Sequence, residues 1–283
     1  MLNGEKITKI ILFLASLSII LIASGMVFSL MGGAMPAFNE FGLKFIISTD
    51  WNPTGGRESY GALPCIIGTV ATSVIAILIC LPLAFSTSLF IGEIFRGTKI
   101  ASFIGMMVDM LAGIPSIVYG LWGFYVLRPW IVEMGFNSQG YGVFTAGLIL
   151  AIMVIPYATS ISVEMIKMVQ NDLKEAAYSL GATRKDVIFN VILPNARSGI
   201  FTSYILAFGR ALGETMAVTM LIGNSNIIPK SLFDTGNTMA SLIANQFGEA
   251  DGLKLSSLVA IALLLFVITG LINGFGKMLI KKI

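Results

Sequence analysis

The sequence predicts an all-α membrane protein with six transmembrane helices, and two observations support this fold class. Hydrophobic residues fill 56% of the 283 positions while charged residues fill only 12%, and the mean hydropathy is +0.88. A soluble domain of this size does not need so much apolar surface, so the composition is typical of an integral membrane protein. In addition, the chain contains separate apolar stretches near the ~20 residues that a membrane-crossing helix requires.

The predicted spans lie near residues 9–31, 64–90, 113–130, 144–165, 200–223 and 256–276. The first follows Lys6 and Lys9, has a longer core than a signal peptide and lacks a convincing cleavage site, so it is expected to remain as an anchor. Residues 32–60 are rich in Gly, Pro and polar residues and are predicted to form an outer loop. The chain is therefore divided into an N-terminal anchor helix with its outer loop (1–60) and a core of five spans (61–283).

Basic residues are divided unevenly between the two sides of the predicted bundle. With the N-terminus in the cytoplasm, the inner segments hold Lys6, Lys9, Arg96, Lys99, Lys167, Lys174, Arg184, Lys185, Arg197, Lys277, Lys281 and Lys282. The outer segments hold Lys44, Arg57, Arg128, Lys230 and Lys254, and Arg210 is left inside the membrane. Because basic residues concentrate on the cytoplasmic side, this bias predicts a multi-pass protein of the plasma or inner membrane with both termini in the cytoplasm.

Residues 100–130 are apolar almost throughout and, as one helix, would reach roughly 46 Å, beyond the ~30 Å hydrocarbon core. A break is expected at Gly113-Ile114-Pro115, because Pro is tolerated in the first turn of a new helix. The apolar residues before the break recur at helical spacing, which favours a helix lying along the inner interface. Asp109 would then lie near the cytoplasmic surface, and a structural capping role is expected for it rather than ion binding.

Residues 172–199 form the longest charged interruption of the apolar sequence. Asp172 followed by Glu175 resembles a capping box, and Gly181 lies where a left-handed C-terminal cap is needed, which predicts a helix of about two turns. Thr183 and Asp186 repeat the capping pattern, so a second helix is expected after a sharp turn. The loop would lie in the cytoplasm.

The first of these two helices is suited to contact another protein. Ala176 and Ala177 leave it thin on one side, and an isolated helix of about two turns is marginal in water, so a partner is expected to hold it. Pro194 is expected to end the second helix, because Pro cannot continue a helix from within. An ordinary cytoplasmic helical hairpin would explain the caps equally well.

The fifth predicted span carries the charges that point to a substrate path. Arg210 lies roughly 17 Å along that span, near the bilayer midplane, and Glu214 would follow on the same face. Intramembrane charges are costly and mark functional sites, and the planar fork of Arg can hold two oxygens of an anion. Glu214 could accept a hydrogen bond from a protonated oxyanion. The alternative is a structural ion pair between the two side chains, and Gly209 and Gly213 are expected to permit close helix packing.

Two absences limit the chemistry of this chain. It contains no histidine, which excludes a His-ligated metal site and a Ser-His-Asp triad within it. It also contains no G-x-x-x-x-G-K-[ST] motif, so it is expected not to be an enzyme with its own ATPase site, and to contain neither a metal nor a cofactor.

The E-A-A triplet, the glycine four residues after it and the later L-P pair resemble the EAA signature of permease subunits of ATP-binding-cassette importers. In that family the loop engages the ATPases. The resemblance therefore implies a role in ATPase coupling for Glu175, Ala176, Ala177, Gly181, Leu193 and Pro194. Val191 stands where the family usually has Ile.

Three longer stretches are similar to the C-type permease of the phosphate-specific transporter, the PstC family. They are WNPTGGRESYGALPCIIGT at 51–69, GIPSIVYGLWGFYVLRP at 113–129 and GRALGETMAVTMLIGN at 209–224. The family's intramembrane Arg and Glu match Arg210 and Glu214. The resemblance implies a type I importer permease fold and a phosphate path, and it places ATP and Mg on a partner ATPase.

The resemblance also implies partners. These are a related A-type permease forming a heterodimer, a P-loop ATPase dimer and an extracytoplasmic phosphate-binding protein, with membrane lipid around them and no nucleic acid. An importer of sulfate or molybdate remains an alternative. A stand-alone secondary anion carrier is a further alternative, although no similarity is found between residues 1–140 and 141–283, where such carriers often have inverted halves.

Overall fold

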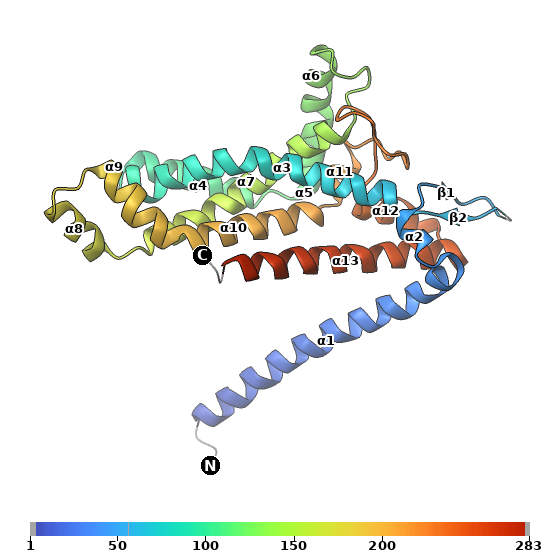
Figure 1. Cartoon of the computed structure of the whole chain (residues 1–283), viewed down its shortest axis with the longest axis horizontal. Coiled ribbons are helices and arrows are strands. Elements are labelled where there is room, and N and C mark those ends of the chain that lie inside the picture. The colour runs from blue at the N-terminus through green and yellow to red at the C-terminus, as the bar shows by residue number, and fades with distance from the viewer. Residues whose placement is uncertain (1–3, 56, 281–283) are drawn as a thin grey trace.

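The computed structural model describes residues 4–55 and 57–280, and this part of the chain is almost entirely helical (Figure 1). Four long helices pack alongside one another: α3 (Leu63–Leu89), α7 (Val143–Lys167), α10 (Leu193–Leu212) and α13 (Gly252–Ile280). The C-terminal part of helix α1 (Gly4–Phe41) contacts α13, whereas the N-terminal part of α1 diverges from the bundle (Figure 1). Lys281 and Lys282, counted above among the inner basic residues, lie outside the described residues.

Shorter elements connect the long helices and cover the two ends of the bundle. They are α2 (Lys44–Ile47), β1 (Trp51–Asn52), β2 (Ser59–Tyr60), η1 (Phe90–Ile94), α4 (Lys99–Ala112), α5 (Ser116–Trp122), η2 (Gly123–Leu127), α6 (Arg128–Glu133), α8 (Asn171–Ser179), α9 (Arg184–Val187), η3 (Ile188–Ile192), α11 (Met216–Thr219), α12 (Met239–Gln246) and η4 (Phe247–Glu249). Strands β1 and β2 form an antiparallel hairpin in which Trp51 faces Tyr60. The hairpin and α12 lie at one end of the bundle, and α8 and both termini of the described chain lie at the other (Figure 1).

Four helices in the described part of the chain are long and apolar enough to cross a membrane. They are Glu5–Phe41, Leu63–Ile94, Val143–Lys167 and Gly252–Ile280, and the bent pair Lys99–Ala112 and Ser116–Glu133 would make a fifth span. Helix α10 is not among them because Arg197, Arg210 and their polar neighbours lower its hydropathy, yet it packs between α3, α7 and α13. The all-α membrane fold is therefore confirmed, and the expected count of six spans is approximate.

The first helix is longer than the sequence suggested, so the prediction that the outer loop begins at residue 32 is wrong. Helix α1 continues through Pro36 because Ala34 and Ala37 are fully buried against α13. The hydroxyl of Ser256 bridges two backbone groups of α1 near the proline. It accepts a hydrogen bond from the N–H of Ala37 at 2.9 Å and donates one to the carbonyl of Gly33 at 2.8 Å. A side chain distant in sequence thus replaces a helical hydrogen bond.

The predicted break at residues 113–115 is confirmed, and α4 and the helices after it are bent by 96°. The expectation that α4 lies along the inner interface is wrong. Val108 packs against Val163, and Asp109 accepts a hydrogen bond from Ser160, so α4 runs beside the second half of α7. Only Ala101 and Val108 of α4 are buried in the bundle, while Ile100, Phe103 and Met110 remain exposed on this chain.

The predicted span 200–223 is also not a single helix. Helix α9 continues through the π-helical segment η3 into α10, so the expectation that Pro194 ends this helix is wrong. Pro194 lies in the first turn of α10, where its missing N–H is tolerated, and the Asn195 side chain donates to the carbonyl of Val191 at 2.6 Å. At the other end, α10 stops at Leu212 and α11 begins only at Met216.

Candidate functional site

Arg210 lies beside the middle of α7. Its guanidinium carbon is 5.5 Å from the centroid of the Tyr157 ring, within the range of a cation–π contact. Tyr157 is about ten residues from the inner end of α7 at Lys167 and about fourteen from its other end, roughly 15 Å and 21 Å. Arg210 is exposed on the surface of this chain although it is at the level of the bundle centre. A charge at that depth requires a polar or protein environment outside this chain.

Helix α10 approaches α13 closely at the residue before Arg210. A Cβ atom on Gly209 would lie 3.1 Å from Oδ1 of Asn273, so the absence of a side chain permits this approach. The packing role expected for Gly209 is therefore confirmed. Gly213 instead caps the C-terminal end of α10. A Cβ atom there would meet only the carbonyl of Gly209, at 3.9 Å, so no other helix approaches Gly213 closely.

Glu214 does not follow Arg210 on the same helical face, which corrects the expectation from the sequence. It lies between α10 and α11, and its Oε1 atom accepts the N–H of Ala217 at 3.5 Å. Among the described residues the ion pairs are Lys9–Glu5, Lys167–Glu164 and Lys174–Glu93, so Arg210 and Glu214 are not joined by one. The expected alternative of a structural Arg210–Glu214 pair is not seen.

The helix is interrupted at residues 213–215, three residues after Arg210, and backbone groups there make local hydrogen bonds. The Thr215 hydroxyl donates to the carbonyl of Gly213 at 3.3 Å, and the Thr219 hydroxyl donates to the carbonyl of Thr215 at 2.7 Å. Irregular backbone at membrane depth is tolerated only where it is buried in protein or lines a watery cavity. The site therefore consists of a broken helix, a cation stacked on an aromatic ring and a carboxylate one helix end away.

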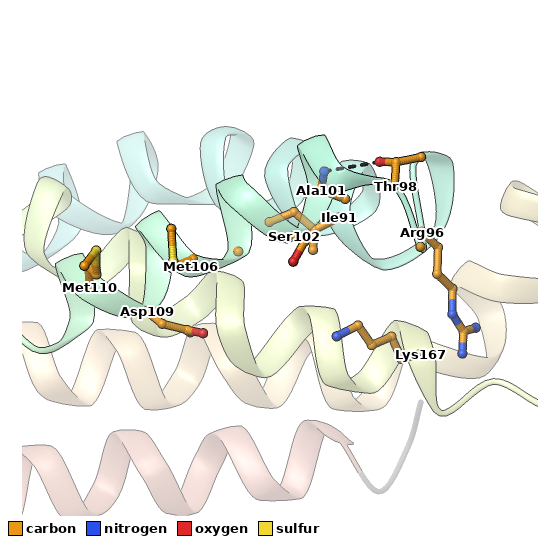
Figure 2. Close-up of a pocket in the computed structure, with 11 residues that line it drawn as sticks. Ile91, Arg96, Thr98, Ala101, Ser102, Met106, Asp109, Met110 and Lys167 are labelled. Atoms are coloured by element: carbon orange, nitrogen blue, oxygen red, sulfur yellow. Dashed lines mark hydrogen bonds between the residues drawn. The ribbon is translucent and has the colours of Figure 1, made fainter.

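A groove of about 810 Å³ lies nearer the α8 end of the bundle, between α4 and the last turn of α7 (Figure 2). Asp109 and Lys167 point into it, and Arg96 lies at its edge. Asp109 is level with Ser160, roughly 10 Å along α7 from Lys167, and its carboxylate caps no helix, so the expected capping role is wrong while its depth in the membrane stays a prediction. Its Oδ1 atom accepts the Ser160 hydroxyl at 3.2 Å.

The loop 172–199 folds as helix, turn, helix. Gly181 follows α8 with φ +85°, which confirms the left-handed cap, and Thr183 and Asp186 form the expected capping box at α9. Asp172 is not the cap expected at α8: the helix begins at Asn171 and Asp172 lies in its first turn. Hydrogen bonds from the hydroxyl and the backbone N–H of Thr183 hold the pKa of Asp186 below its ordinary value.

The two ends of this loop present different surfaces. Glu175 and Ala176 are exposed and Ala177 is half-buried, so one face of α8 is open to a partner. Leu193 is half-buried and Pro194 is exposed where α10 begins. Lys174, next to the exposed Glu175, is buried instead.

The profile of the family described as "Binding-protein-dependent transport system inner membrane component" matches residues 84–283. The chain belongs to this family. The resemblance seen in the EAA-type loop is therefore confirmed, and the chain is a multi-pass inner membrane permease.

Two relatives of the permease are similar over nearly their whole length. "Phosphate transport system permease protein PstC" of Mesorhizobium japonicum is 43% identical over 95% of this chain and 88% of that protein. The protein of the same name from Pasteurella multocida is 38% identical over 94% of this chain and 88% of that protein. These relatives are transport permeases rather than enzymes.

Chains from two solved ABC transporters have the same fold, which confirms the expected fold. A chain of a bacterial ABC transporter that imports the acidic polysaccharide alginate has a TM-score of 0.64 at 16% identity, covering 99% of the permease and 98% of that chain. A chain of the inward-facing MetNI methionine ABC transporter has a TM-score of 0.61 at 18% identity, covering 76% and 92%. Permeases of this family work with ATPases and binding proteins.

Sequence reasoning missed three residues of the permease: Tyr157, Glu93 and Lys174. Tyr157 was not predicted because an aromatic residue in an apolar span is common and does not by itself indicate a functional role. Lys174 was counted only as a basic residue of an inner loop, and its partner Glu93 lies 81 positions away. Within the described residues no group of His, Cys, Asp and Glu side chains is arranged to hold a metal ion.

Proposed function

We propose that this chain is the permease subunit of an ATP-binding-cassette importer that moves inorganic phosphate into the cell. The observation that carries the proposal is Arg210, a cation at the level of the bundle centre that this chain leaves uncovered. The names of the PstC relatives supply the substrate class. Arg210 supplies a physical reason for an oxyanion substrate, because its fork can donate two parallel hydrogen bonds to one anion.

Glu214 favours phosphate over sulfate in this proposal. Hydrogen phosphate still carries a proton that a carboxylate can accept, whereas sulfate has none to donate near neutral pH. An importer of sulfate or molybdate is the second candidate, since Arg210 alone would accept any of these anions.

The uncovered surfaces support a second, related permease of the A-type as a partner. Besides Arg210, most of α1 is exposed: its most apolar window has none of its residues buried within this chain. A charged side chain and a continuous apolar helix need different environments, and a second permease together with lipid would supply both. The substrate path would then lie between the two permeases.

The energy would come from a P-loop ATPase dimer that docks on α8, through the exposed Glu175 and Ala176. The path would receive phosphate from an extracytoplasmic binding protein at the end formed by the β1–β2 hairpin and α12 (Figure 1). Both termini and α8 lie at the opposite end, which supports a cytoplasmic location for them. A stand-alone carrier would not need such an exposed docking helix.

The proposal is tested by tagging this chain in its native membrane, extracting it gently and identifying the proteins recovered in comparable amounts. We expect a P-loop ATPase and a second permease. The recovered complex is then reconstituted in vesicles loaded with ATP, and uptake of labelled phosphate, sulfate and molybdate is compared. Phosphate uptake that requires ATP supports the proposal; ATP-dependent uptake of sulfate alone, or phosphate uptake by the isolated chain without ATP, contradicts it.

A further inference from the structure

Lys174 of α8 and Glu93 of η1 form a buried ion pair. It joins the loop 172–199, called the coupling loop below, with α8 as the coupling helix, to the end of α3. The Lys174 Nζ and Glu93 Oε2 atoms are 2.6 Å apart, and the side chains are only 9% and 12% exposed. The Lys9–Glu5 pair of α1 has the same separation but is 73% and 76% exposed. The pair on α8 is thus shielded from water, whereas the pair on α1 contributes little, as exposed pairs usually do.

A second contact from the same loop reaches the same place. Arg184, at the start of α9, donates through Nη2 to the carbonyl of Ile94, and the same atom is 3.5 Å from the carbonyl of Glu93. The two helices that flank the turn at Gly181 therefore both hold residues 93–94. Because α8 has only nine residues, it needs such contacts to stay in place.

Residues 90–94 are in turn fixed to α7. A Cβ atom on Gly92 would lie 3.0 Å from Cγ2 of Ile166 and 3.5 Å from the carbonyl of Val163, so this segment approaches α7 as closely as a glycine permits. It also continues α3 without interruption. A displacement of Glu93 would therefore move the inner ends of α3 and α7 together.

We propose that the Glu93–Lys174 pair is the mechanical link through which movement of the coupling helix reaches the membrane bundle. The inference rests on the proposed function, because it requires an ATPase that moves α8. Glu175 and Ala176 face outward to that partner while Lys174 points inward, so adjacent residues of one turn contact the ATPase and the bundle. A buried ion pair is suited to this link because it is directional, and losing one partner leaves an uncompensated buried charge.

The test uses the whole complex in vesicles and measures phosphate imported per ATP hydrolysed. The variants are Glu93→Gln, Lys174→Met and the reversed pair Glu93→Lys with Lys174→Glu. Each single variant should lower the import ratio by about tenfold or more, with ATP hydrolysis continuing independently of the binding protein. The reversed pair should recover a ratio within about threefold of the unmodified complex. Lys9→Met, which removes the exposed pair on α1, should change nothing.

An unchanged import ratio in both single variants would overturn the link, and so would a reversed pair that is no better than either single variant. If a single variant fails to assemble, Glu93→Cys with Lys174→Cys replaces it, joined by a short bis-methanethiosulfonate reagent that forms a disulfide with each thiol and releases sulfinate. Import should be high when the cross-link is present and low after its reduction; import unaffected by reduction contradicts the proposal. The unmodified complex is measured in parallel: if it imports no phosphate, the proposed function fails, while the dependence of ATP hydrolysis on the binding protein still tests the link.

Discussion

Arg210 and Glu214 are four residues apart in the sequence but lie on opposite sides of a helix end. Helix α10 carries Arg210 in its last turn, and Glu214 follows after the helix has stopped at Leu212. A continuous helix would place the two side chains on one face, where they would neutralise each other. No ion pair joins them among the described residues, and Arg210 instead contacts the ring of Tyr157 and is exposed on this chain.

Replacing Arg210 tests the substrate path. Arg210→Gln should abolish phosphate uptake while the complex still assembles, because the side chain is exposed on this chain and removing its charge does not leave a buried partner unpaired. Arg210→Lys should retain a reduced rate, since an ammonium keeps the charge but loses the bidentate fork. Uptake of labelled phosphate and recovery of the tagged complex are both measured. Normal uptake by Arg210→Gln would rule out the site.

Tyr157 should matter through its ring rather than its hydroxyl. Tyr157→Phe keeps a ring under the guanidinium and should leave phosphate uptake nearly unchanged, whereas Tyr157→Leu should weaken uptake by about 2- to 30-fold, the range of a cation–π contact of about 0.5–2 kcal/mol. The uptake rate is measured against phosphate concentration. Equal loss in both variants would point to the hydroxyl and contradict this role.

Gly181 should set the rigidity of the coupling loop. Its φ of +85° is unfavourable for a side chain, although a Cβ there would meet nothing within 4 Å. Gly181→Ala should therefore destabilise the turn by about 1–2 kcal/mol through backbone strain alone, and amide hydrogen exchange of residues 171–180 should rise. Gly181→Asn is the matched variant, because Asn adopts left-handed conformations more readily than Ala. Its amide exchange should lie between those of the unmodified protein and Gly181→Ala.

Asp186 should make the α9 cap sensitive to acid. Its pKa is lowered in the folded protein by Thr183, so the stability it contributes is present above the pKa of the unfolded chain and is lost as the pH falls through the lowered value. Amide exchange at residues 186–187, after correction for the intrinsic pH dependence, should increase over that acidic range. Thr183→Ala should remove most of this pH dependence and Thr183→Ser should preserve it. If the corrected amide exchange of the unmodified protein did not change with pH, the cap would not depend on the carboxylate of Asp186.

Composition and local patterns were sufficient for most of the fold. Long apolar runs predicted α3, α7 and α13 within a few residues, since helices in lipid must satisfy their own backbone hydrogen bonds. Gly181 and the Thr183–Asp186 pair gave the coupling turn, because left-handed backbone and helix caps depend on a few adjacent residues. The same local reasoning failed at Pro36, where Ser256 from α13 repairs the helix.

The residues by themselves determined that this chain is an integral membrane protein with a charged residue in an apolar segment and a capped helical loop, and the permease role came from the family resemblance. Those properties follow from hydropathy, side-chain charge and local backbone preference. Only the tertiary structure decided that α10 ends before Glu214, that α4 packs beside α7, and that Lys174 meets Glu93. These features depend on contacts between segments far apart in the chain, and a buried charge or a helix break is tolerated only where such a contact compensates for it.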